Sequence, residues 1–270
     1  MNQYEIKEAL QIGKRIYGTC LSSPSPKMAM QLKNANLDFV FIDTEHCPFD
    51  RTQVSWMCQV FRNMNVAPFV RIPSHSPYEA CAMLDGGAAG IIAPYIETVE
   101  QVQQLRGAVK YRPLKGEKLQ RVLDGTYKLT EEEVNFFKRY NQEHLLILNI
   151  ESRAAVDHID EILAVPDIDA IFIGPHDLSI NLGKPEDYEN PEWEDYISTT
   201  IKKCLEHNVG VGNHFSFDIE KQINWAKQGM NILIWNVDSI RIVQALNQDF
   251  SHIKDALEED IGEVGIAGDI

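Results

Sequence analysis

The sequence lacks the long apolar runs and short motifs that mark several large classes of protein. No stretch of about 18 apolar residues occurs, so no transmembrane helix is expected. The first 15 residues are polar and lack the apolar core of a secretory signal. GxGxxG, P-loop, GxSxG and HExxH patterns are also missing. Their absence argues against dinucleotide binding, P-loop nucleotide hydrolysis, serine hydrolysis and zinc-dependent proteolysis.

Cysteines are few, odd in number and scattered. The chain has 5, and no CxxC pair occurs among them. This pattern predicts reduced, buried or half-buried thiols in a cytoplasmic protein, rather than a disulfide framework or a zinc site.

Basic residues are scarce relative to acidic ones. The 25 Lys and Arg face 40 Asp and Glu, which gives a net charge of −15. Such a surface repels phosphate backbones and anionic membranes, so neither a nucleic acid nor a membrane is expected as a partner. An anionic substrate would need a local cationic pocket.

Eight short apolar runs alternate with longer amphipathic segments. This alternation predicts a parallel sheet with helices on both faces. Eight units favour a closed (β/α)8 TIM barrel, which commonly needs about 250 residues. A doubly wound open sheet is the alternative, weakened by the missing glycine-rich turn. The runs span residues 16–23, 38–46, 67–73, 90–96, 144–151, 170–179, 210–215 and 231–238.

No linker divides the chain, so residues 1–270 are expected to form a single barrel domain. The fourth and fifth runs are separated by an unusually long segment, which predicts a long loop and one extra helix. The last helix is expected to end near residues 258–260, and residues 258–270 to form a frayed tail.

Polar residues terminate several of the apolar runs, where a barrel places its chemistry. Glu151 and Asp177 are 26 residues apart, about one βα unit, so they should lie on adjacent strands. Two such carboxylates suit a hard divalent ion such as Mg²⁺ or Mn²⁺, although a structural ion pair fits the spacing as well. The full set of terminating residues is Asp43, Glu45, His46, Arg71, Asn149, Glu151, Gly174, His176 and Asp177.

Arg71 and His46 each allow two interpretations. Arg71 can be a fork for a substrate carboxylate, a partner in a salt bridge with Glu45 or Asp43, or both. His46 is either structural or a general base oriented by Asp43, three residues earlier.

The remaining histidines and the lysines carry less information. His176 and His214 lie at strand ends, where they can line the pocket, whereas His75, His144, His158, His207 and His252 are interpreted as surface residues. None of the eight apolar runs contains Lys, which argues against imine chemistry.

Five segments taken together resemble the HpcH/HpaI family of metal-dependent, class II pyruvate aldolases. They are DFVFIDTEHCPFD, PFVRIP, LDGGAAGIIAPYIETVEQ, ILNIESRAAVDHIDEIL and IDAIFIGPHDLS, in that order. The resemblance covers most of residues 16–183 and implies a (β/α)8 barrel whose final helix packs on a neighbouring subunit. It also implies a homo-oligomer, a hexamer or a trimer.

The resemblance assigns roles to the terminating residues. Glu151 and Asp177 are similar to the ligands of a divalent cation, Mg²⁺, Mn²⁺ or Co²⁺. Arg71 resembles the arginine that holds the oxo-acid carboxylate and stabilises the enolate, and His46, held by Asp43, resembles the acid/base. The other implied positions are Glu45, the acidic position of the catalytic motif, and the substrate-binding residues Asn149, Gly174, Pro175 and His176.

The implied reaction cleaves or forms a 4-hydroxy-2-oxo acid, with a small 2-oxo acid and an aldehyde as partners. A metal that chelates the 2-oxo acid stabilises its enolate, so no nucleophilic lysine is needed. The alternatives are an acyl-CoA lyase of the citrate or malyl-CoA type and a noncatalytic barrel that binds oxo acids. The chain departs from the family pattern at Asn149, at His176, across residues 112–128 and in the last strand, which leaves the aldehyde open.

Overall fold

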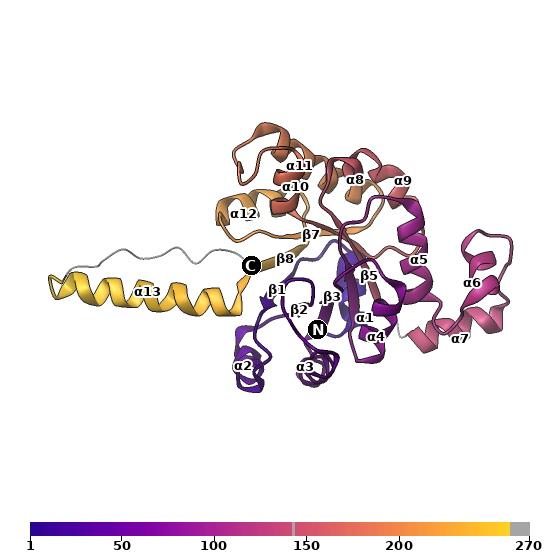
Figure 1. Ribbon diagram of the computed structural model, residues 1–270, viewed down its shortest axis with the longest axis horizontal. Coiled ribbons are helices and arrows are strands. Elements are labelled where there is room, and N and C mark those ends of the chain that lie inside the picture. The colour runs from indigo at the N-terminus through magenta and orange to yellow at the C-terminus, as the bar shows by residue number, and fades with distance from the viewer. Residues whose placement is uncertain (142–143, 260–270) are drawn as a thin grey trace.

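The chain folds into a closed barrel of eight parallel strands (Figure 1). The computed structural model describes residues 1–141 and 144–259. Each strand pairs in parallel with the next, and β8 pairs with β1, so the predicted (β/α)8 barrel is confirmed and the open sheet is excluded. The strands are β1 (Ile16–Leu21), β2 (Phe39–Asp43), β3 (Ala67–Arg71), β4 (Gly90–Ala93), β5 (Leu145–Ile150), β6 (Ala170–Ile173), β7 (Gly210–His214) and β8 (Ile232–Val237).

A helix follows each strand, and most of these helices cover the outside of the barrel (Figure 1). Side-chain caps start several of them; Asp50 and Thr98, for example, form capping boxes at α3 and α5. The helices are α1 (Gln3–Gln11), α2 (Pro26–Leu32), η1 (Lys33–Ala35, a 3₁₀ turn), α3 (Arg51–Asn63), α4 (Pro77–Asp85), α5 (Val99–Lys110), α6 (Gly116–Leu123), α7 (Glu131–Asn141), α8 (Arg153–Asp157), α9 (Ile159–Leu163), α10 (Pro175–Asn181), α11 (Pro191–Glu206), α12 (Ile219–Gln228) and α13 (Asp238–Ala256).

Two apolar layers hold the barrel together because strand side chains alternate between its inside and outside. Phe41, Phe69 and Phe172 belong to the inner layer, whereas Val40 and Val70 pack outward against the helices. Helix α1 adds Ile6, Ala9 and Leu10 to the inner layer, next to strand residues such as Ile16 and Gly210. Since these contacts lie near the strand starts, the opposite end, where the strands finish, is left for a site.

Several predicted strands extend too far. The run 38–46 becomes a strand only to Asp43, and the run 170–179 only to Ile173. Pro175 opens α10, where its missing N–H costs no hydrogen bond. The polar residues at the ends of these runs therefore follow the strands, with Glu45 and His46 in a loop and His176 and Asp177 in the first turn of α10.

One histidine is misplaced by the sequence interpretation. His144 is buried, 3% exposed, and not on the surface. Burial, together with the nearby charge of Arg112, lowers the pKa of His144 to about 3, so its ring stays neutral.

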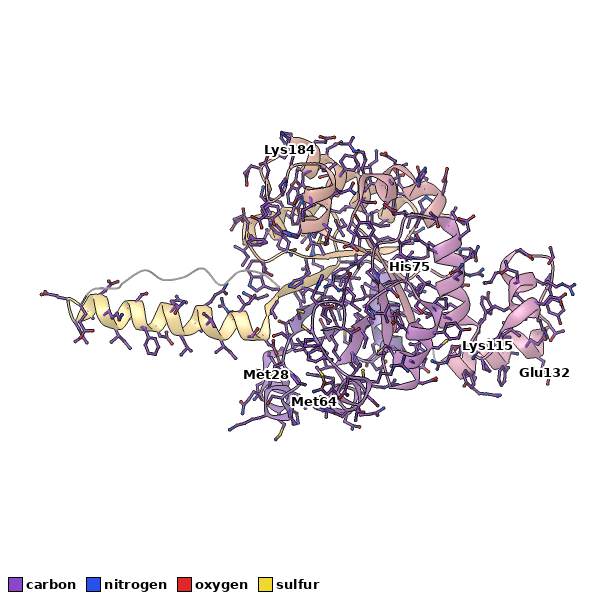
Figure 2. All side chains as sticks on the ribbon, in the orientation of Figure 1. Met28, Met64, His75, Lys115, Glu132 and Lys184 are labelled. Carbon is purple, nitrogen blue, oxygen red and sulfur yellow. The ribbon has the colours of Figure 1, made fainter. Side chains whose placement is uncertain are left out.

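The segment between β4 and β5 contains two extra helices rather than the one expected. Helices α6 and α7 project from the side of the barrel beyond α5 (Figure 1). Lys115 and Glu132 mark this projection in Figure 2. Leu119 and Leu123 of α6 approach Gly107 of α5, and this contact joins the projection to the barrel wall.

Helix α13 extends away from the barrel instead of packing along it (Figure 1). It ends at Ala256, slightly before the predicted 258–260, and most of the predicted frayed tail, residues 260–270, lies outside the described residues. Across residues 1–141 and 144–259, no helix combines the length and apolarity needed to cross a membrane. Large apolar side chains stand exposed along α13 and at its C-cap, namely Ile242, Val243, Leu246, Phe250, Ile253 and, at the cap, Leu257.

Candidate active site

Arg71 stands at the centre of the polar groups gathered at the strand ends. It is the last residue of β3, and its side chain is only 12% exposed. Its Nε and Nη2 donate to the two carboxylate oxygens of Asp43 at 2.9 and 2.6 Å, and Nη1 lies 3.1 Å from Glu45 Oε2. The guanidinium also lies over the Phe41 ring, 5.3 Å from its centroid. The predicted salt bridge to Glu45 or Asp43 is therefore confirmed, and Arg71 makes it with both carboxylates, which fix the plane of its guanidinium.

Arg71 and Asp43 hold each other in the ionised state. Burial by itself would lower the pKa of Arg71, but the bonded Asp43 and the charge of Glu45 raise it above its ordinary value. Burial would likewise raise the pKa of Asp43, yet its bonds to Arg71 lower it. Burial raises the pKa of Glu45, and the Arg71 charge opposes that change only in part.

His46 is not held by Asp43 as the sequence interpretation expected. Both Asp43 oxygens bind Arg71, and Oδ1 also accepts the Glu45 N–H at 3.0 Å. The His46 Nε2 instead lies 3.9 Å from Glu45 Oε2, and the side chain is 46% exposed. Asp43 and Arg71 stand opposite each other on the neighbouring strands β2 and β3, and the guanidinium binds both oxygens of the Asp43 carboxylate. The His46 side chain therefore stands partly exposed beside Glu45.

Glu151 follows β5 and is buried, with its carboxylate held by neutral donors. Oε1 accepts the backbone N–H of Tyr95 at 2.7 Å, and Oε2 accepts Asn149 Nδ2 at 3.4 Å. A side chain at Gly174 has no room, because an added Cβ would lie 2.3 Å from Glu151 Oε2. Burial raises the pKa of Glu151 to about 7, and the nearby charge of Asp177 adds to this effect.

These residues fit a hard divalent cation. Glu151 and Asp177 lie close enough for their charges to interact, and both offer oxygen donors, which Mg²⁺ and Mn²⁺ prefer. The buried Asn149 Oδ1 beside Glu151 has no hydrogen-bond partner among the residues that the structure describes. No cluster of three or more His, Cys, Asp or Glu suited to a metal occurs within residues 1–141 and 144–259. Two protein ligands would leave positions for water and a chelating substrate.

The loop that opens α10 brings Gly174, Pro175, His176 and Asp177 to the same edge. Pro175 is buried, and its carbonyl accepts Trp193 Nε1 at 2.8 Å, which anchors the loop. His176 is exposed, and its Nδ1 lies 3.0 Å from the hydroxyl of Tyr188. That pairing ties His176 to the segment between α10 and α11.

Tyr95 is a site residue that sequence patterns did not indicate. It has a left-handed backbone, φ 50°, and this conformation aims its N–H at Glu151. A backbone donor leaves no signature in the residue type. For His214, in contrast, the end of an apolar run did place it correctly at the barrel mouth.

The buried Arg71 and the carboxylates of Glu151 and Asp177 stand together where the strands of the barrel end, an arrangement suited to a small organic acid. Residues 17–245 match the model of the HpcH/HpaI aldolase/citrate lyase family, and the chain belongs to that family.

Relatives with established activities are similar over nearly the whole chain. The hydroxypyruvate/pyruvate aldolase of Roseovarius nubinhibens is 27% identical over 246 residues, 90% of this chain and 93% of the relative. The 2-keto-3-deoxy-L-rhamnonate aldolase of Escherichia coli K12 is 31% identical over 255 residues, 92% of each chain. The crystal structure of an HpcH/HpaI aldolase from Desulfitobacterium hafniense DCB-2 has the same fold, with a TM-score of 0.79 at 24% identity, and covers 97% of this chain and 99% of its own. The chain is thus a carbon–carbon lyase of the aldolase type.

Proposed function

We propose that this enzyme cleaves or forms a 4-hydroxy-2-oxo acid, with pyruvate or a close relative as the 2-oxo acid and an aldehyde as the second partner. The observation that carries the proposal is the placement of the Arg71 fork and the Glu151–Asp177 pair at the same mouth of the barrel. A 2-oxo acid carries a carboxylate and a ketone on adjacent carbons, so it can engage both features at once.

Glu151 and Asp177 are the residues that would hold a divalent cation, Mg²⁺, Mn²⁺ or Co²⁺. When bound, such a cation supplies Lewis-acid polarisation of the ketone. The donors from Tyr95 and Asn149 keep the Glu151 carboxylate in place for this role. The raised pKa of Glu151 also fits a carboxylate that awaits a cationic partner.

Arg71 holds the negative charge of the oxo acid and of the enolate that follows proton loss. Its position is fixed by Asp43 and Glu45 before substrate arrives, so the charge is met without reorganisation. The backbone from Gly174 to Asp177 lines the same edge, where it can receive the substrate carboxylate.

His46 moves the proton between the substrate oxygen of the aldehyde half and solvent. Its exposure at the barrel mouth and the neighbouring Glu45 carboxylate support this role. A general base at this place needs only hydrogen-bond reach to the substrate or to an intervening water.

Helix α13 packs against the barrel of a neighbouring subunit in this proposal. Its exposed apolar stripe needs a cover, and a groove of about 410 Å³ lies between α12, β1 and β8, where an eighth barrel helix would normally pack. Tyr17, Ile219 and Ile223 line that groove and are themselves exposed. A trimer or hexamer would bury both surfaces. The five free thiols are consistent with a reducing, cytoplasmic location.

A panel of 4-hydroxy-2-oxo acids, including 2-keto-3-deoxy sugar acids, tests the function. Pyruvate release should require a divalent cation, disappear with EDTA and return with Mg²⁺, Mn²⁺ or Co²⁺. Glu151→Gln and Asp177→Asn should weaken cation binding as well as turnover. Cleavage that depends on a CoA thioester instead would contradict the proposal, as would full activity after rigorous removal of metal.

A further inference from the structure

His214 is an inward-facing imidazole at the barrel mouth that the steps above do not use. It ends β7, where Val211 and, just after the strand, Phe215 belong to the outer apolar layer. Since side chains alternate between the two faces of a strand, His214 faces the opposite way from Val211 and Phe215 and points into the barrel. Its ring packs edge-on against Phe41, with the centroids 5.9 Å apart. The Arg71 guanidinium lies over the same Phe41 ring, so His214 and Arg71 both pack against Phe41.

One nitrogen of the His214 ring interacts with the protein backbone, and the other is available to a ligand. The backbone of Asn236 raises the pKa of the imidazole, as a carbonyl does when it accepts from a ring N–H, so the proton is assigned to the nitrogen on that side. Among the described residues, the ring has no other hydrogen-bond partner. Burial, together with the charge of Arg71, lowers the pKa of His214 to about 4, which keeps the imidazole neutral. The second nitrogen is then an acceptor and suits a hydroxyl donor.

Strand order determines which part of a substrate His214 meets. The groups proposed to hold the oxygens of the 2-oxo acid come from β3, β5 and the loop after β6. His214 lies on the next strand, on the side of the barrel that remains for C3 of the acid. When C3 is a methyl carbon, as in pyruvate, the acceptor nitrogen of His214 has no partner on the substrate. When C3 carries a hydroxyl, as in hydroxypyruvate, that hydroxyl can donate to it.

We propose that His214 is a specificity-determining residue, which accepts a hydrogen bond from a hydroxyl on C3 of the 2-oxo acid. The enzyme then favours a hydroxylated oxo acid such as hydroxypyruvate over pyruvate itself. This inference rests on the proposed function, because it assumes that the oxo acid binds between Arg71 and the Glu151–Asp177 pair.

The test uses hydrogen–deuterium exchange at C3, measured with the metal-loaded enzyme in deuterated water and without any aldehyde. Exchange rates for hydroxypyruvate and pyruvate are expressed as a ratio, which cancels general losses of activity. His214→Leu should lower the ratio about tenfold, the typical effect of one lost neutral hydrogen bond. His214→Gln, which keeps an acceptor, should retain more of the ratio. His158→Leu, the same substitution at an exposed site outside the barrel, should leave the ratio as in the wild type.

The outcomes distinguish a failure of the role proposed for His214 from a failure of the proposed aldolase function. An unchanged ratio in His214→Leu, or an effect seen only when an aldehyde is added, overturns the role at C3 while the aldolase assignment stands. Absence of exchange with both acids in the wild type overturns the proposed function itself. If His214→Leu does not fold, as judged by thermal unfolding, His214→Phe takes its place, and a ratio equal to that of the wild type contradicts the inference.

Discussion

Gly174→Ala is a substitution whose effect can be worked out from the site geometry. The glycine has φ −93° and ψ 89°, angles that alanine also adopts, so the backbone itself is not strained. The added Cβ, however, would lie 2.3 Å from Glu151 Oε2 and 2.7 Å from Glu151 Cβ. An ordinary contact is about 3.4 Å, so the Glu151 carboxylate must shift by about 1 Å.

A shift of this size should show in function more than in stability. A displacement of about 1 Å at a reacting group commonly costs about a hundredfold in rate. Overpacking should cost roughly 1–3 kcal/mol of unfolding free energy. We therefore expect Gly174→Ala to bind Mn²⁺ more weakly in calorimetric titration and to lose about a hundredfold in kcat/KM.

The matched control is Gly86→Ala. That glycine also has an ordinary φ, −72°, and an added Cβ there would approach its nearest atom, Met83 O, only to 3.3 Å. Its metal affinity and kcat/KM should equal those of the wild type. Wild-type Mn²⁺ affinity in a folded Gly174→Ala enzyme would refute the argument that Gly174 makes room for the Glu151 carboxylate.

Four further variants test other parts of the account. Arg71→Lys should lower kcat/KM by on the order of a hundredfold or more, because a point charge cannot replace the two-point fork; near-normal activity would show that the fork is dispensable. His46→Ala should lower turnover by roughly a hundred- to ten-thousandfold while oxalate still binds, and lost oxalate affinity would instead place His46 in binding. His176→Ala should change the relative rates with different aldehydes, and an unaltered aldehyde profile would remove His176 from the acceptor side. His144→Gln tests stability in acid. The folded-state pKa of about 3 lies below the unfolded value of about 6.5, so the wild type is most stable above pH 6.5 and loses about 2 kcal/mol by pH 5. Denaturant titrations should show this loss in the wild type and a smaller one in the variant; equal losses in both would contradict the assignment.

The barrel was predictable because its signal is repeated eight times. Most strands are short apolar runs, and several helices begin with a side-chain cap, so errors at single boundaries do not alter the count. The strand boundaries were less certain. Glu45 and Asp177 belong to the predicted runs 38–46 and 170–179, but both lie beyond the ends of strands β2 and β6. Helix α13 points away from the barrel, and the periodicity of its apolar residues does not specify that direction.

The positions of the candidate site residues were predictable, and their contacts were less so. Position at strand ends brought Arg71, Glu151 and Asp177 to one edge, as expected. Which carboxylate Arg71 binds depends on side-chain reach between neighbouring strands, so the expected contact between Asp43 and His46 was wrong. The donor from Tyr95 belongs to the backbone, and a residue pattern does not encode it directly.

Exchange of the pyruvate methyl protons in deuterated water tests the central claim most directly. This reaction isolates enolate formation, the step for which Arg71 and the Glu151–Asp177 pair are proposed to act together. Proton NMR should show rapid loss of the methyl signal with wild-type enzyme and Mg²⁺ or Mn²⁺, and almost none after EDTA or with Glu151→Gln. If the metal-loaded enzyme produces no exchange, or if exchange continues unchanged after the metal has been removed, the account is contradicted.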